Sequence, residues 1–497
     1  MSADVGARDS PVHGRVVFVV GGPGSGAERV AAALGALPGL AYCPAPTDLG
    51  RAGAGLRLVG YDMGSADAGV AASGAAALAG PSEFLSAARE LADVPFAALL
   101  ARTGARRVVE YSDEHAWLIG YLARLYPDAT YLAVVRSRDA VLATLSATGS
   151  LTAATRAGYE RDAAALVTAR SAGHPPLLRD VDVDALTADP DAAATLARLV
   201  GEPAPGPRVA AAVSRRLAGD PALPIDPPDP TTPFDPLASP LAGRLVVILG
   251  APRSGTTWLH RLLSAHPRIA GTATGETWLF RPGAAAWRRH RVGSGLAPWI
   301  GEAALLDSER RFCDRLFTAF RDRDKPAASH VIEKTPAHVW DLDFLARLYP
   351  DASYVHILRD GRDVALSLRR IDGAFPSLAA AAEQWAASVA AVRSHAENLP
   401  RFVELRYEDL LADSLGALAP LWRWLGLPDD AEARANATVL ITERVSPLPS
   451  QGRVGAGKWR DLEPAALAEI EGVAGPTLRR CGYPLARARV HLPGSRP

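Results

Sequence analysis

Residues 244–267 read RLVVILGAPRSGTTWLHRLLSAHP, an apolar run followed by a glycine-containing turn and an amphipathic run. The first run has the length and β-branched content of a buried strand, and the second has the apolar spacing of a helix that buries one face. The small residues between them allow a sharp turn that presents backbone N–H groups to an anion. The positive end of the helix dipole adds to this attraction. This segment therefore predicts a strand, an anion-binding loop and a helix.

The side chains of this loop also suit a negatively charged ligand. Thr256 and Thr257 stand at the expected helix start, where hydroxyl groups can cap N–H groups or bind phosphate oxygens. Arg253 adds a planar, permanently charged donor. An ATP- or GTP-binding loop would carry lysine where Thr256 stands, and no Mg²⁺-binding aspartate follows a second apolar strand. These departures argue against Mg²⁺-dependent phosphoryl transfer.

The chain contains two copies of one domain. Segment 108–129 reads VVEYSDEHAWLIGYLARLYPDA and segment 331–352 reads VIEKTPAHVWDLDFLARLYPDA, with twelve of 22 positions identical. Two further pairs of segments match in the same order: 15–26 with 244–255, and 131–146 with 354–369. Shared composition alone would not preserve that order, and the period is too long for a solenoid of short repeats.

A proline- and aspartate-rich run, GDPALPIDPPDPTTPFDPLASPLAG, separates the two copies. Proline fixes φ and removes a backbone donor, so the run predicts an extended, semi-rigid linker. The expected organisation is an N-terminal domain at 1–218, the linker at 219–243 and a C-terminal domain at 244–497. In each copy, the recurring order of helix, proline-containing turn and apolar strand predicts an α/β fold. We expect a mainly parallel β-sheet covered by helices, with ligands at the carboxyl ends of the strands.

The composition excludes several classes of partner. The 497 residues exceed one ordinary core, and 54 basic residues balance 54 acidic ones, which points to neither a nucleic-acid nor a membrane partner. Three well-separated cysteines favour neither a disulfide framework nor a metal site. The N-terminus lacks the pattern of a signal peptide, and no apolar run is long enough to span a bilayer. A cytoplasmic location is expected, and the arginine-rich, lysine-poor composition suggests a bacterial source with a GC-rich genome.

Three motifs of the C-terminal copy resemble those of sulfotransferases that use PAPS (3'-phosphoadenosine-5'-phosphosulfate). Residues 250–267 resemble the 5'-phosphosulfate-binding segment, and YVHILRDGRDVALSL at 354–368 resembles the 3'-phosphate-binding segment. GKWRD at 457–461 is similar to the late loop that closes over the nucleotide. TGETW at 274–278 and EKTPAHVW at 333–340 are most similar to the tyrosylprotein-sulfotransferase branch and its bacterial relatives. The resemblance implies a P-loop-like fold, PAPS as donor, PAP as desulfated product, and no metal.

The resemblance also implies which residues hold the nucleotide. One group would cradle the 5'-phosphosulfate: Arg253, Ser254, Gly255, Thr256 and Thr257. A second would bind the 3'-phosphate that distinguishes PAPS from ATP: Arg359 and Ser367. Tyr407 would contact the nucleotide or pack beneath it, and Lys458 would contact a phosphate. Trp459 would stack near adenine or belong to the core. Ser446 and Arg453 would belong to the closing loop.

Two side chains, helped by Arg253, are expected to carry the transfer itself. Lysine occurs only at positions 325, 334 and 458 in this arginine-rich chain. The compact ammonium of Lys334 can sit on the bridging oxygen of the breaking S–O bond, where charge develops. Glu276 is the expected general base that takes the proton of the acceptor hydroxyl. Lys325 lies in a charged run and receives no role.

Glu333 is the alternative base, because related carbohydrate sulfotransferases use a glutamate beside the lysine. On a strand, however, Glu333 would point away from Lys334. Glu110 occupies the same position in the N-terminal copy, and His115 likewise matches His338. Their presence in both copies favours structural roles for Glu333 and His338.

The N-terminal copy has lost most of the site. The positions aligned with Arg253, Thr256, Thr257 and Lys334 hold Gly24, Ala27, Glu28 and Tyr111. Glu28 places an anion where a phosphate would bind, and no GKW segment precedes the linker, although Arg136 and Thr144 remain. We expect this copy to be catalytically inactive and to pack against the active copy or present the acceptor. The acceptor is a small-molecule or peptide hydroxyl, and a P-loop kinase and a non-catalytic nucleotide-binding scaffold are the alternative functions.

Overall fold

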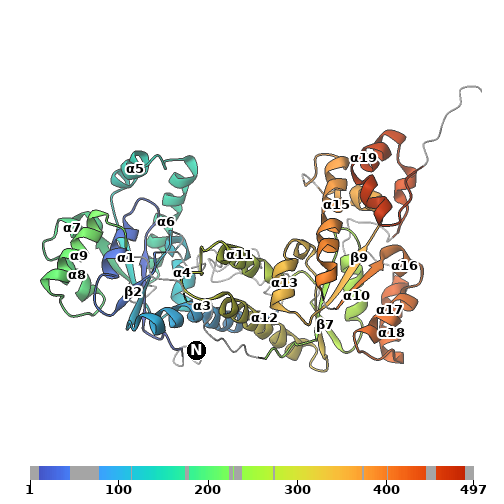
Figure 1. Cartoon of the computed structure of the whole chain (residues 1–497), viewed down its shortest axis with the longest axis horizontal. Helices are drawn as coiled ribbons and strands as arrows, with labels where there is room; N and C mark the ends of the chain where they lie inside the picture. The colour runs from blue at the N-terminus through green and yellow to red at the C-terminus, as the bar shows by residue number, and fades with distance from the viewer. Residues whose placement is uncertain are drawn as a thin grey trace, which may run out of the picture. The chain divides into compact units, whose positions relative to one another are not determined.

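The computed structural model describes residues 10–44, 78–113, 115–173, 178–222, 228, 238–272, 275–371, 374–399, 401–443 and 455–486. The chain divides into two compact units (Figure 1). Unit 1 comprises 1–239 together with 278–317, and unit 2 comprises 240–277 together with 318–497. Unit 1 therefore includes a segment, 278–317, whose sequence belongs to the C-terminal copy.

Unit 1 is built on a parallel sheet of five strands. In chain order these are β1 (Val16–Val20), β2 (Leu40–Tyr42), β3 (Arg107–Tyr111), β4 (Thr130–Val135) and β5 (Leu178–Asp182). Their order in the sheet is β2-β3-β1-β4-β5. The central strand β1 consists of five buried apolar residues, as expected for a parallel strand that is covered on both faces.

Helices cover both faces of this sheet, and alternate side chains of β1 point to each. Val17 and Val19 pack in the cluster formed with α1 (Ala27–Leu34), α7 (Val183–Ala188), α8 (Ala192–Leu199) and α9 (Pro207–Ala218). Phe18 points the other way and contacts aromatic rings near α3 (Pro81–Thr103) and α4 (His115–Leu125). The other helices of the N-terminal copy within the described residues are α5 (Arg138–Ala147) and α6 (Ala153–Ser171).

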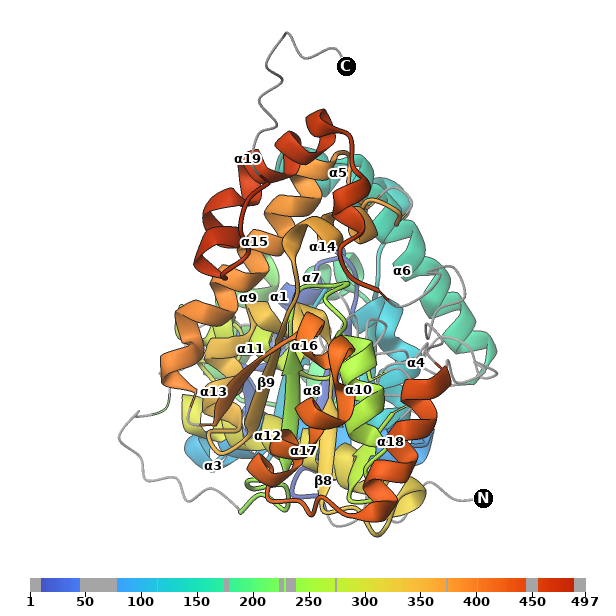
Figure 2. The ribbon, with the colours of Figure 1, turned by 90° about the vertical axis from the view of Figure 1, so that its right-hand side faces the viewer.

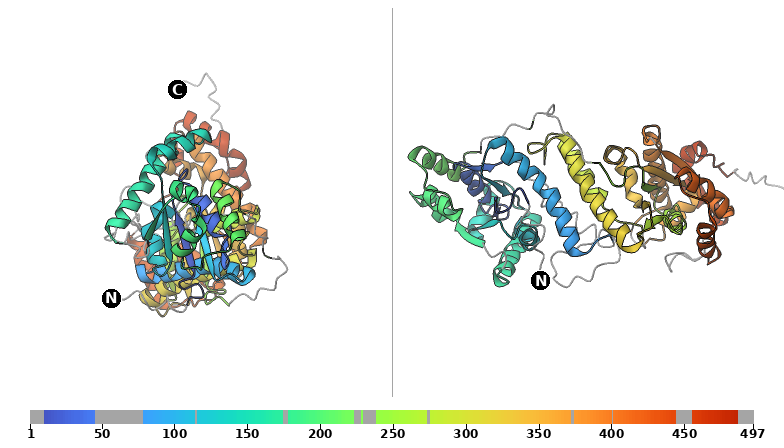
Figure 3. Two further views of the ribbon diagram at one scale, coloured as in Figure 1. Left: turned by 90° about the vertical axis from the view of Figure 1, so that its left-hand side faces the viewer. Right: turned by 90° about the horizontal axis from the view of Figure 1, so that it is seen from below.

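The second-copy segment of unit 1 contains α11 (Phe280–Arg291) and most of α12 (Glu302–Asp324), and it contacts α3. Figure 3 shows α3 in blue and α12 in yellow. Arg102 donates to the carbonyl oxygens of Pro298 and Trp299 at 2.6 and 2.9 Å. Arg315 binds Glu83 and Glu90 of α3. Helix α3 therefore holds residues 298–315 by both ionic and apolar contacts, including Phe84 against Phe312.

Unit 2 repeats the same sheet. Its strands are β6 (Leu245–Leu249), β7 (Ile269–Gly271), β8 (His330–Glu333), β9 (Ser353–Leu358) and β10 (Phe402–Arg406). Their order, β10-β9-β6-β8-β7, is that of unit 1 when the equivalent strands are matched, and all four pairs are parallel. The expected α/β, P-loop-like architecture in two tandem copies is confirmed.

Helices again cover both faces (Figure 2). One face packs against α10 (Thr256–Ser264), α16 (Tyr407–Ala412), α17 (Ser414–Trp424) and α18 (Ala431–Glu443). The other packs against α14 (Gly361–Leu368), α15 (Leu378–His395) and α19 (Pro464–Arg480). Unit 2 also contains α13 (Leu342–Leu348) and the short 3-10 helices η2 (Pro336–Trp340), η3 (Ala396–Asn398) and η5 (Lys458–Asp461). None of the helices in the described ranges is both long and apolar enough to cross a bilayer.

Lys325 corrects one sequence-based expectation. Its ammonium is half-buried and donates to the carbonyl oxygens of Ser264, His266 and Ile269 at 2.9, 2.7 and 2.8 Å. These carbonyls lie at the end of α10 and the start of β7, where backbone acceptors lack helical partners. Lys325 therefore closes the α10–β7 connection and is not part of a merely solvated charged run.

Candidate active site

The loop between β6 and α10 has an unusual backbone conformation that only particular residues tolerate. Gly255 has a φ of 98°, and a Cβ atom there would lie 2.4 Å from Cδ2 of Tyr407. Arg253 has a φ of 74° without being glycine, a left-handed conformation that costs about 1 kcal/mol. Such strain is typical of functional sites. No described side chain caps the N-terminus of α10, so its backbone N–H groups are directed at the loop.

Two guanidinium groups meet at one end of this loop. The Arg253 Nε atom donates to Oγ of Ser367 at 3.0 Å, and Nη1 of Arg359 donates to the carbonyl oxygen of Arg253 at 3.1 Å. Burial and the nearby Arg359 charge lower the pKa of Arg253, although a guanidinium stays protonated. The ring of Tyr407 lies beneath Arg359, with its centroid 4.3 Å from Cζ. These contacts create a cationic cluster of Arg253 and Arg359 near the carboxyl ends of β6 and β9.

A second group of side chains meets at the start of α10. The Lys334 ammonium, which follows β8, donates to Oε1 of Glu276 at 2.6 Å and to Oγ1 of Thr257 at 3.0 Å. The Lys334 side chain is 1% exposed, whereas that of Glu276 is 36% exposed. Burial lowers the pKa of Lys334, and the Glu276 carboxylate opposes this shift. The structure thus brings together the expected lysine, the expected base and one threonine of the anion-binding loop.

Glu333 points to a different environment from its neighbour Lys334. It is fully buried and accepts hydrogen bonds from Oγ1 of Thr277 at 3.0 Å and Oγ1 of Thr335 at 2.6 Å. Nε2 of His338 lies 3.2 Å from its second oxygen. Burial alone would raise the pKa of Glu333, but the His338 charge and these hydrogen bonds bring it below its usual value. An inaccessible, multiply bonded carboxylate is poorly placed to take a proton from an acceptor.

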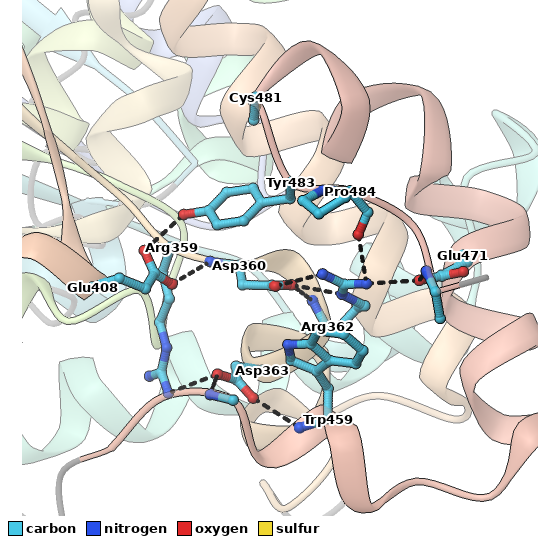
Figure 4. Close-up of polar contacts among 12 residues, drawn as sticks. Arg359, Asp360, Arg362, Asp363, Glu408, Trp459, Glu471, Cys481, Tyr483 and Pro484 are labelled. Carbon is cyan, nitrogen blue, oxygen red and sulfur yellow. Dashed lines mark hydrogen bonds and ion pairs between the residues drawn. The ribbon is translucent and has the colours of Figure 1, made fainter.

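Asp363, which sequence reasoning missed, connects the late loop to Arg359 of the cationic cluster (Figure 4). Its carboxylate accepts from the backbone N–H groups of Gly457 and Trp459 at 2.6 and 3.0 Å. Nη2 of Arg359 lies 3.8 Å from the same carboxylate and donates to the carbonyl oxygen of Gly455 at 2.8 Å. The i,i+4 spacing from Arg359 on a helical start was a signal available in the sequence.

The two expected binding residues of the late loop, Trp459 and Lys458, have different surroundings. The Trp459 ring is covered by the Arg362 guanidinium, with Cζ 3.4 Å from the ring centroid (Figure 4), and Arg362 is itself paired with Asp360 and Glu471. Lys458 is exposed on η5. The closing-loop candidates Ser446 and Arg453 lie outside the described residues.

The N-terminal copy retains the part of this arrangement around Arg136, the counterpart of Arg359. Nη1 of Arg136 donates to Oγ1 of Thr144 at 2.7 Å and to the carbonyl oxygen of Gly24 at 3.3 Å. The second bond is the counterpart of that from Arg359 to Arg253. Nε of Arg136, however, is paired with Asp184 at 3.0 Å.

The rest of the N-terminal site is chemically changed. A cavity of about 810 Å³ is bordered by Glu28, Tyr111, Asp113, Arg136 and Thr144, among other residues. Burial, followed by the charges of Asp113 and Glu28, raises the pKa of Tyr111 well above its usual range. A carboxylate, that of Glu28, and a neutral phenol, that of Tyr111, thus stand where the C-terminal copy has Thr257 and Lys334. Across the described ranges of both copies, no three His, Cys, Asp or Glu residues are grouped to hold a metal ion.

Comparison with known proteins agrees with this repeated architecture. The sequence profile of the sulfotransferase family matches two segments, residues 16–196 and 246–431. Nodulation protein NoeE of Sinorhizobium fredii is 35% identical over 130 residues, covering 24% of this chain and 30% of that protein. Protein-tyrosine sulfotransferase 1 of Danio rerio is 26% identical over 261 residues, covering 48% of this chain and 72% of that protein. The match to the nodulation protein thus spans less than half of that protein's length.

Among solved structures, the sulfotransferase domain from the curacin biosynthetic pathway aligns with 50% of this chain and 99% of its own. Its sequence identity is 17% and the TM-score is 0.34. Mouse sulfotransferase SULT7A1, solved in complex with PAP, aligns with 48% of this chain at 15% identity and a TM-score of 0.31.

The two copies are thus α/β domains in which a glycine-containing loop joins the first strand to the helix that follows it. Because the family profile covers most of both copies, the chain belongs to the sulfotransferase family.

Proposed function

We propose that the C-terminal copy transfers a sulfuryl group from PAPS to a hydroxyl group of a small molecule or peptide. The observation that carries this proposal is the meeting of Lys334, Glu276 and Thr257 at the N-terminus of α10. Arg359 and Ser367, which suit the 3'-phosphate, contact Arg253 of this loop. Family membership and the tyrosylprotein sulfotransferases among the relatives support the same reaction class.

In the proposed reaction, the acceptor oxygen attacks the sulfur atom in line with the bridging oxygen. A new S–O bond forms while the bond from sulfur to the 5'-phosphate oxygen breaks, and PAP leaves with that electron pair. The Glu276 carboxylate takes the acceptor proton, and the Lys334 ammonium stabilises the charge on the bridging oxygen. The two side chains contact each other directly before substrates bind. Arg253 adds a third charge near the phosphosulfate.

The N-terminal copy does not catalyse transfer in this proposal. Glu28 and Asp113 repel the phosphosulfate, and Arg136 is already paired with Asp184. Its contribution is as an internal partner, supported by the contacts of α3 with residues 298–315. A cytoplasmic location is part of the proposal, which fits three buried cysteines that form no disulfide.

The direct test is calorimetric titration of the full-length protein with PAP, with ATP as control and no added metal. The expected result is one PAP site per chain and much weaker binding of ATP, because ATP lacks the 3'-phosphate. Two sites would contradict the inactive N-terminal copy. No binding by the folded protein would overturn the assignment of PAPS as donor, and ATP consumption with Mg²⁺ would favour a kinase.

A further inference from the structure

Unit 2 contains a buried group of charged side chains that the proposed reaction does not use. Glu333 and His338 are 0% exposed, and Asp341 is 1% exposed. Nε2 of His338 lies 3.2 Å from Oε2 of Glu333, and Nδ1 lies 3.9 Å from Oδ2 of Asp341. Removing such charges from water is costly, and the cost is acceptable only where the partners are well placed. A buried ionic group of this kind is therefore a candidate for fixing local geometry.

The geometry in question is that of the segment carrying Glu276. Oε1 of Glu333 accepts hydrogen bonds from the backbone N–H of Thr277 at 3.3 Å and from its Oγ1 at 3.0 Å. On the other side, the carbonyl oxygen of Gly275 accepts from the backbone N–H of Lys334 at 2.8 Å. Both chain neighbours of Glu276 are thus tied to residues 333 and 334. The Lys334 side chain then meets the Glu276 carboxylate at 2.6 Å.

We infer that Glu333 and His338 form a positioning pair that holds Glu276 against Lys334 for proton transfer. His338 fixes the Glu333 carboxylate, and Glu333 fixes Thr277. Neither side chain reaches the reacting atoms, so neither is a catalytic residue. This inference rests on the proposed roles of Glu276 and Lys334, and it assigns a different role to the glutamate that was the alternative base.

The N-terminal copy supplies an internal comparison. Glu110 and His115 occupy the equivalent positions and are equally buried, with Nε2 of His115 at 3.7 Å from Oε1 of Glu110. The position of Asp341, however, holds Leu118. Burial without a second carboxylate lowers the pKa of His115 to about 3, whereas Glu333 and Asp341 overcome burial and raise the pKa of His338 to about 9. The histidine with the raised pKa thus belongs to the copy that carries Lys334 and Glu276, and the histidine with the lowered pKa to the copy that has lost the lysine.

The test compares Glu333→Gln and His338→Gln with the matched variants Glu110→Gln and His115→Gln in the full chain. Turnover is measured with PAPS and 4-nitrophenol as the acceptor probe, and PAP binding is measured by calorimetry on the same samples. The unit 2 variants are expected to lower kcat by about 100-fold, because a small misplacement of a reacting group has an effect of that size. The dissociation constant of PAP should change less than about threefold, since the proposed contacts of its 3'-phosphate with Arg359 and Ser367 lie on other segments.

The pH–rate profile should also change in the unit 2 variants, because a displaced general base contributes less to the rate. The two matched variants should leave kcat, PAP binding and the pH profile unchanged. The inference is overturned if Glu333→Gln keeps wild-type kcat, or if Glu110→Gln lowers kcat as strongly as Glu333→Gln does.

Hydrogen exchange separates failure of this inference from failure of the proposed function. In Glu333→Gln, amides of residues 275–279 should exchange faster than in the wild type, whether or not the protein turns over PAPS. If Glu333→Gln exchanges faster but the wild-type protein binds no PAP, the proposed function is refuted and the positioning of the loop stands. Unchanged exchange in a protein that is active with PAPS would refute the positioning pair alone.

Discussion

At the scale of single residues, Lys334 is the most exacting test of the proposed chemistry. We expect Lys334→Ala to lower kcat by about 100- to 1,000-fold, the usual effect of removing one group that stabilises developing charge. PAP affinity should also fall, because the bridging oxygen beside the ammonium remains on PAP as an oxygen of its 5'-phosphate. Steady-state kinetics and calorimetry on the same preparation measure both quantities.

Lys325 provides the matched control for Lys334. Lys325→Ala removes three hydrogen bonds from a charged donor to backbone carbonyls, so we expect unit 2 to lose about 2 kcal/mol of stability. Its kcat at 20 °C should stay within about twofold of the wild type. A large fall in kcat for Lys325→Ala with unchanged thermal stability would show that the distinction between the two lysines is wrong.

The two arginines that follow β4 and β9 can be compared directly. Arg359→Ala should weaken PAP binding by at least about tenfold, because a guanidinium–phosphate contact is a charge-assisted hydrogen bond. Arg136→Ala should leave PAP binding unchanged, since Arg136 is paired with Asp184. Calorimetric titration at fixed ionic strength is the appropriate measurement. Equal weakening in both variants would mean that the N-terminal copy also binds the nucleotide.

At the scale of elements, the turn into α10 depends on Gly255. Gly255→Ala would force a Cβ atom against the Tyr407 ring in a backbone conformation that alanine rarely adopts. We expect a loss of about 1–3 kcal/mol in unit 2 stability and a marked loss of PAP affinity. Gly26→Ala, at the equivalent turn before α1 with a φ of 85°, should destabilise unit 1 and spare PAP binding. Denaturation curves and calorimetry distinguish these outcomes.

The elements themselves were largely predictable because their signals are local. The strand, loop and helix of residues 244–267 follow from apolar spacing and small turn residues, and β6 and α10 have nearly those bounds. The comparison of the two copies also predicted structural roles for Glu333 and His338. Both side chains are fully buried. The sequence did not predict the hydrogen bonds that the backbone N–H groups of Gly457 and Trp459 donate to Asp363. They join residues more than 90 positions apart, and no local pattern specifies such a contact.

At the scale of the whole molecule, the two histidine environments predict that the units respond differently to alkali. The raised pKa of His338, about 9, means that its stabilising charge is fully present below about pH 6.5 and is lost as pH rises through 9. His115, whose pKa is lowered to about 3, is neutral throughout this range. The unfolding transition of unit 2 should therefore move to lower temperature between pH 7 and pH 10, whereas that of unit 1 should not change for this reason.

Scanning calorimetry can check this prediction, and PAP can identify the transition of unit 2 because a ligand raises the stability of the unit that binds it. In His338→Gln, the alkaline shift of that transition should be much smaller. An equally large shift in the variant would assign the pH response to other groups. Division of the chain into units also required the three-dimensional contacts, because the sequence alone does not indicate that residues 278–317 join unit 1.

The left-handed residue in the anion-binding loop has a further consequence for how the copies diverged. Arg253 and Gly24 have nearly the same φ, 74° and 78°, so the backbone path has been retained while the side chain has been lost. Glycine adopts this conformation at little cost, whereas arginine does not. In the proposal that the N-terminal copy is inactive, Gly24 avoids the backbone strain that Arg253 bears, the trade between activity and stability that natural enzymes commonly show. A duplicated domain that no longer has to catalyse a reaction can become the more stable of the two domains.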